Sequence, residues 1–126
     1  NPFRKIQWIT SAVEQLKKNK DLDSVFSVNQ LYKHFWHIDK EKPKKVLKWM
    51  SNYTSRQVAP KLFREDTGIT CATRSKFWRA GKRIGKKVKF IVNNDSITGI
   101  DIHSKLDLKM ADFLIKYLKK KKISYF

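Results

Sequence analysis

Apolar side chains recur at helical spacing in two parts of the chain, one near each end. The first part predicts an amphipathic helix over residues 2–19, with its apolar face at Ile6, Ile9, Val13 and Leu16. The second predicts a helix capped by Asp107, with a core stripe at Leu106, Met110, Phe113, Leu114, Tyr117 and Leu118. We expect this last helix to pack against the core.

The middle of the chain predicts shorter helices. Ser27 to Gln30 has the form of a capping box, which predicts a helix over residues 28–37. Pro43 suits the first turn of a third helix, with its buried side at Val46, Leu47, Met50 and Tyr53. Thr70 and Gly81 are placed to begin and end a further helix, and two short helices around a glycine turn have the outline of a helix-turn-helix.

Two β-branched runs predict strands at residues 88–92 and 97–102, joined by a polar turn at 93–96. The expected fold is α+β, a mostly helical single domain over residues 1–126 with one late β-hairpin and a C-terminal packing helix. One natural assembly of these elements is a winged-helix-like domain, in which the hairpin is the wing.

Two segments, Ser27 to Phe35 and Val46 to Met50, resemble the helix-pair core of small DNA-binding domains of large DNA viruses and phage antirepressors. The resemblance covers less than a quarter of the chain and implies a pair of helices that serves DNA binding. Strands expected ahead of that core are replaced here by the predicted helix over residues 2–19.

Charge favours an anionic partner. The chain has 29 Lys and Arg against 11 Asp and Glu, a net charge of +18, while 40% hydrophobic and 13% aromatic residues fit a folded protein. So much positive charge destabilises a compact state through self-repulsion, which a bound polyanion relieves. DNA, RNA and an anionic membrane surface are the candidates, and compositional bias in the source genome is the alternative explanation.

Residues 67–94 concentrate this charge and contain no Asp or Glu. We expect the cations of this stretch to bind nucleic acid, double-stranded DNA before RNA, through phosphate contacts: Arg74, Lys76, Arg79, Lys82, Arg83, Lys86, Lys87 and Lys89. Six to ten such contacts would reduce affinity by roughly three to five decades between 50 and 200 mM salt. We interpret Phe77 and Trp78 as core residues, with stacking on a nucleic-acid base as the alternative. A helix-turn-helix among these cations implies a role in transcription regulation.

Two other functions fit the sequence. His34, His37 and His103 are candidates for a small metal-independent ribonuclease, although no catalytic residue, metal ligand or cofactor is assigned, and an enzyme is less favoured than a binding module. A scaffold for an acidic protein or a membrane is the other. The sequence predicts no transmembrane segment, and its single cysteine, Cys71, favours an intracellular location in nucleus, nucleoid or cytoplasm.

Overall fold

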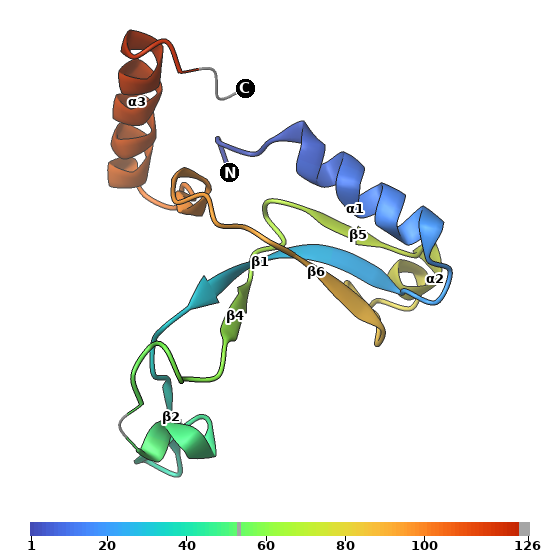
Figure 1. Cartoon of the computed structure of the whole chain (residues 1–126), viewed down its shortest axis with the longest axis vertical. Coiled ribbons are helices and arrows are strands. Elements are labelled where there is room, and N and C mark those ends of the chain that lie inside the picture. The colour runs from blue at the N-terminus through green and yellow to red at the C-terminus, as the bar shows by residue number, and fades with distance from the viewer. Residues whose placement is uncertain (53, 124–126) are drawn as a thin grey trace. The chain divides into compact units, whose positions relative to one another are not determined.

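The computed structural model describes residues 1–52 and 54–123, and within them it has three α-helices and six strands in two sheets (Figure 1). The chain divides into two compact units, Asn1–Asn29 with Glu65–Phe126, and Gln30–Arg64. Each unit is described separately below. The expectation of a single domain over the whole chain stays a prediction.

A four-stranded sheet is built around β1 (Ser24–Leu31), which pairs with the three other strands: β4 (Leu62–Glu65), β5 (Cys71–Thr73) and β6 (Val88–Val92). β1 is antiparallel to β5 and parallel to β6, with Phe26 opposite Cys71 on one side and Phe90 on the other. Five consecutive residues, Ser24 to Val28, are buried, so this strand is covered on both faces.

The helix α1 (Ile6–Lys18) packs against β5 and covers one face of this sheet (Figure 1). Its buried residues Ala12 and Leu16 meet Val25 of β1, and Leu22, Ala72 and Ile91 pack around them. The helix predicted from the apolar spacing is therefore confirmed, although it begins at Ile6 instead of residue 2. Of its predicted apolar face, Leu16 is buried and Ile9 half-buried, while Ile6 and Val13 are exposed.

The last helix, α3 (Lys105–Lys120), is also confirmed, and it contributes to a second small core formed by Phe3, Ala111 and Leu118. Its N-cap is Ser104 rather than the predicted Asp107. The Ser104 hydroxyl accepts the Asp107 N–H at 3.2 Å, and the Asp107 carboxylate accepts the Ser104 N–H at 2.7 Å. These two bonds form a capping box, which fixes where the helix begins.

The second unit carries a two-stranded antiparallel sheet of β2 (Trp36–Asp39) and β3 (Lys42–Lys45), followed by a short 3-10 helix at Lys48–Ser51. Lys40 and Glu41 join the strands with φ of 46° and 65°, the left-handed conformation that a tight two-residue hairpin needs. Met50 is fully buried here, and its sulfur accepts the N–H of Phe35 at 3.4 Å.

The prediction of a mostly helical architecture is wrong because the middle of the chain forms strands. The segment predicted as a helix over residues 28–37 belongs to β1 and β2, so Ser27 and Gln30 are strand residues and form no capping box. The third predicted helix is replaced by β3 and the 3-10 helix, and its predicted member Tyr53 lies outside the described residues. The helix pair implied by the resemblance to viral DNA-binding domains is therefore not formed.

The predicted hairpin, wing and helix-turn-helix are also wrong. Residues 88–92 do form a strand, β6, but it pairs in parallel with β1, and Ile97–Gly99 is a 3-10 helix. Residues 71–73 belong to β5, and the only helix in that region, α2 (Ser75–Arg79), spans five residues and buries none of them. Gly81 does follow this helix in the left-handed conformation, with φ of 70°, whereas the N-cap is Arg74 instead of Thr70.

Candidate anion-binding surface

The basic stretch of residues 67–94 lies entirely in the first unit, where it forms β5, α2, a turn and β6. The eight cations predicted to bind nucleic acid are therefore neighbours in one unit, but they are not chemically equivalent. Three of their side chains bond to other parts of the protein, and five are exposed and form no ion pair within the described residues. The two groups are described in turn.

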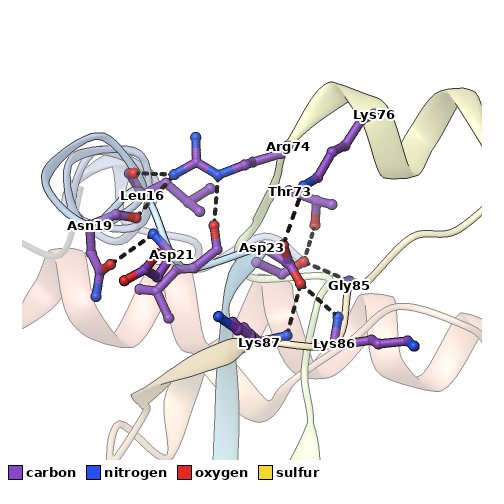
Figure 2. A network of polar contacts seen from close by, with 12 residues as sticks. Leu16, Asn19, Asp21, Asp23, Thr73, Arg74, Lys76, Gly85, Lys86 and Lys87 are labelled. Carbon is purple, nitrogen blue, oxygen red and sulfur yellow. Dashed lines mark hydrogen bonds and ion pairs between the residues drawn. The ribbon is translucent and has the colours of Figure 1, made fainter.

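Arg74 is a structural residue. Its Nε donates to the carbonyl oxygen of Leu22 at 2.7 Å, and its Nη2 donates to those of Leu16 and Asn19 at 2.9 and 3.0 Å (Figure 2). These carbonyls lie at and just beyond the end of α1, where a helix leaves its last C=O groups without partners and carries partial negative charge. The guanidinium joins α1 to the start of α2.

Asp23 organises the opposite side of this network, directly before β1. One carboxylate oxygen accepts the backbone N–H groups of Lys86 and Lys87 at 3.0 and 2.9 Å, and the other lies 3.8 Å from Nζ of Lys76 (Figure 2). The hydrogen bond from Lys87 is the main cause that lowers the pKa of Asp23, with further lowering from Lys86 and Lys76. The fold therefore places an acid that is distant in sequence next to the cations of the basic stretch.

Arg83 is the third cation with an internal partner, because its guanidinium forms an ion pair with the carboxylate of Glu65. The turn around it is fixed by its backbone: the carbonyl oxygen of Arg83 accepts the Thr73 hydroxyl at 2.8 Å, and the Ser24 hydroxyl accepts the Gly85 N–H at 2.9 Å. The turn between α2 and β6 is consequently held to β1 and β5 by side chains rather than left as a free loop.

The five other predicted cations are exposed, and their side chains form no ion pair with any residue in the described ranges: Arg79, Lys82, Lys86, Lys87 and Lys89. We call these five residues the free cation set. Hydrogen bonds from backbone N–H groups hold the turn that carries Lys86 and Lys87 in place. The charged side chains of the set point to solvent, as that of Lys86 does in Figure 2. Fixed backbone with unpaired ammonium and guanidinium groups suits phosphate or carboxylate ligands.

The two aromatic residues of α2 have different environments. Phe77 is half-buried beside Gly85, which agrees only in part with the interpretation as a core residue, because α2 has no fully buried residue. Trp78 is 55% exposed, so that interpretation is wrong for this residue. Its indole lines an open groove of about 540 Å³ between α1 and the β5 region, together with Arg4, Ile9, Thr67, Cys71 and Arg83.

An adjoining groove of about 420 Å³ shares Trp78 and adds Val13 and Lys17 of α1. Arg4 and Lys17 were missed in the sequence because they lie outside the basic stretch. The signal that could have found Lys17 is its position four residues after Val13, which puts both on one side of α1. The grooves thus combine an exposed aromatic ring with a cation of α1, Lys17, and with cations outside the helices, Arg4 and Arg83.

The three histidines are divided between the two units. His34 lies in the second unit with its ring edge-on to Trp49 at 5.4 Å between centroids, and His37 lies exposed on β2. His103 belongs to the first unit and pairs with Asp101 at 3.3 Å. Within residues 1–52 and 54–123, no three His, Cys, Asp or Glu side chains gather in a way that could hold a metal ion.

The second unit contains a separate small cavity of about 30 Å³. Tyr32, His34, Trp49 and Arg56 are among the residues that line it, and the Arg56 guanidinium lies 5.5 Å from the centroid of the Tyr32 ring. The volume is that of about one water molecule, so by itself it holds no more than a single small polar group.

Comparison with known proteins gives one informative similarity. The chain is 28% identical over 116 residues to "Post-translational flagellin modification protein B" of Campylobacter coli, a match that covers 91% of this chain and 49% of that protein. The chain therefore spans about half the length of the curated relative it matches. No family model matches the sequence. None of the helices in the described residues has the length and apolar character that crossing a bilayer requires.

Proposed function

We propose that this chain is part of a protein that acts in post-translational protein modification, and that the free cation set binds a phosphate-bearing substrate of that process. The observation that carries this proposal is the similarity to the flagellin modification protein, because it extends over 91% of the chain. Groups that enzymes transfer are often delivered on carrier molecules, and phosphate is a common part of such carriers. The substrate class is therefore an anion that cations can hold.

The geometry supports a small anionic ligand as well as a large one. The free cation set lies on α2, its following turn and β6, and bonds with Asp23, Ser24 and Thr73 fix the backbone of the turn. A preorganised set of charges loses less conformational entropy when it binds a ligand than a flexible basic tail does. The exposed Trp78 ring, next to Arg79 in sequence, offers a face on which a base or sugar ring could stack.

Double-stranded DNA is the second candidate, favoured by the net charge of +18 and by the free cation set, which is exposed. The five residues of α2 are too few for the recognition helix of a helix-turn-helix, so binding here would rest on phosphate contacts without base readout. Both candidate ligands belong to compartments that hold nucleotides or nucleic acid, so the proposal includes an intracellular location.

Competition binding tests the two candidates together. A fluorescent duplex and, separately, inorganic pyrophosphate and a nucleoside triphosphate are titrated with the chain by anisotropy and calorimetry at several salt concentrations. The proposal predicts saturable binding of the small phosphates and their displacement of the duplex. Duplex binding that resists millimolar pyrophosphate, with a log–log salt slope near −4.5 for about five contacts, would instead establish the nucleic-acid function.

A matched pair of variants locates the site. Replacing the free cation set with Ala should abolish phosphate binding. The control variant removes an equal number of positive charges at other exposed positions: Lys105, Lys109, Lys119, Lys120 and Lys121. If the two variants lose affinity equally, binding depends on net charge alone, and the proposed site is wrong.

A further inference from the structure

The helix α3 has two apolar faces, and the described residues of the chain cover one of them. Ala111 and Leu118 are buried against Phe3, with Leu114 and Ile115 packed beside them. The second face is a stripe that the sequence assigned to the core: Leu106, Met110, Phe113 and Tyr117. The structure corrects that assignment, because these four side chains are 65%, 48%, 66% and 47% exposed.

The spacing of this α3 stripe is that of a helix-packing seam. Its members follow one another at intervals of four, three and four residues, which places them on one line along the helix. The Phe113 and Tyr117 rings stack with centroids 6.4 Å apart, which makes a continuous apolar surface at the C-terminal end. A helix with apolar residues on more than one side is normally buried on more than one side.

Charge along the edge of the stripe indicates what kind of surface would cover it. The residues immediately before its four members are Lys105, Lys109, Asp112 and Lys116, three cations and one acid. Lys116 and Asp112 are paired at 2.7 Å, which leaves Lys105 and Lys109 without an ion pair in the described residues. A second copy of α3 would bring the same lysines to the interface, whereas an apolar surface edged with Asp or Glu complements them.

The similarity to the flagellin modification protein offers a candidate for the polypeptide that covers the stripe. The match accounts for 49% of that protein, so about half of its length lies outside the region equivalent to this chain. We propose that the α3 stripe is the docking surface for a polypeptide corresponding to this unmatched half, which presents an apolar patch with an acidic edge. The inference concerns assembly and is independent of which anion the free cation set binds.

The test is direct association of two purified polypeptides. The 126-residue chain carries a fluorescent label and is titrated with the unmatched half of the Campylobacter coli protein, made as a separate chain. We expect a saturable one-to-one complex by anisotropy and sedimentation, with slower amide hydrogen exchange in α3 on binding. No complex under these conditions, or a complex without protection of α3, would overturn the proposal.

Substitutions on α3 decide whether the stripe forms the interface. Phe113→Gln should weaken the complex by roughly tenfold or more, since truncation of a central aromatic anchor has effects of this size. Leu108→Gln is the matched control, because Leu108 is 57% exposed on the same helix but on the side away from the stripe. Thermal melts of both variants should match the parent. Equal weakening by both substitutions contradicts docking through the stripe.

Two further measurements exclude other occupants. Lys109→Glu should weaken the complex if the partner edge is acidic, and an unchanged affinity would refute that part of the proposal. Sedimentation of the labelled chain alone should show a monomer. A dimer that Phe113→Gln dissociates would show that a second copy covers the stripe, and the proposal would then be wrong.

Discussion

The carboxylate of Asp23 accepts the backbone N–H of Lys87 at 2.9 Å, and this bond fixes the turn that precedes β6. Asp23 directly precedes β1 and Lys87 directly precedes β6, so the contact joins the starts of two parallel strands. The same carboxylate oxygen accepts the N–H of Lys86. An acid thereby sets the position of the turn from which two members of the free cation set project.

Asp23 should make stability depend on pH in the acidic range. Its pKa is below the ordinary value of 3.8, chiefly because of the hydrogen bond from Lys87, so the folded state binds a proton less readily than the unfolded state. The stabilisation is therefore present above about pH 4 and is lost as the pH falls through the folded pKa. The melting temperature should decrease as the pH is lowered from 7 to 3, and it should decrease less steeply for the Asp23→Asn variant. Asp107 also has a lowered pKa, mainly from the Ser104 hydroxyl, so some dependence remains in that variant.

Gly85 should not tolerate a side chain. A Cβ at this position would collide with the Asp23 side chain and lie 2.9 Å from Cζ of Phe77. Gly85→Ala should destabilise the protein by about 1 to 3 kcal/mol, the usual range for overpacking, as measured by chemical unfolding. Gly99→Ala is the control, since a Cβ there meets nothing within 4 Å and the residue has no positive φ. Equal stability of the two variants would mean that the turn is looser than described.

Substitutions of Arg74 and Arg79 should have different effects, one on the stability of the fold and the other on anion binding. Arg74→Ala removes three hydrogen bonds from a charged donor to carbonyl oxygens and should destabilise the fold by about 1.5 to 3 kcal/mol. Arg79→Ala removes an exposed cation and should leave the unfolding free energy within about 0.5 kcal/mol of the parent while it weakens anion binding. Unfolding curves and phosphate titrations measure both effects. Unchanged stability on loss of Arg74 would contradict its role as the link to α1.

The two long helices could be predicted because their signal is local. In α1 and α3 an apolar period near 3.6 continues for three turns or more, and no other structure explains such a pattern. β1 gives no comparable signal. It is buried on both faces between Ser24 and Val28, so the alternation that marks a half-buried strand is missing, and the serine and glutamine around Val28 imitate a helix start. Its partners β5 and β6 are distant in sequence.

For the candidate site, the sequence predicted the basic composition but not the contacts of each residue. The absence of acids among residues 67–94 marks the stretch as basic, and five of its eight cations are indeed exposed without ion pairs in the described residues. The sequence does not show which cations bond to other parts of the protein, because their partners lie outside the basic stretch. These partners are Asp23 for Lys76, Glu65 for Arg83 and carbonyls at the end of α1 for Arg74. Such pairings depend on the tertiary fold, which the sequence pattern misassigned.

The capping box of α3 should contribute measurably to stability. Ser104→Ala removes the hydroxyl that accepts the N–H of Asp107, and loss of such a cap costs about 0.5 to 2 kcal/mol. Ser96→Ala is the matched control, because Ser96 precedes the 3-10 helix at Ile97–Gly99 without a side-chain capping bond. Chemical unfolding monitored by circular dichroism should show the loss for Ser104 alone. If the second core around Phe3 held α3 in place without the cap, the two variants would unfold at the same denaturant concentration.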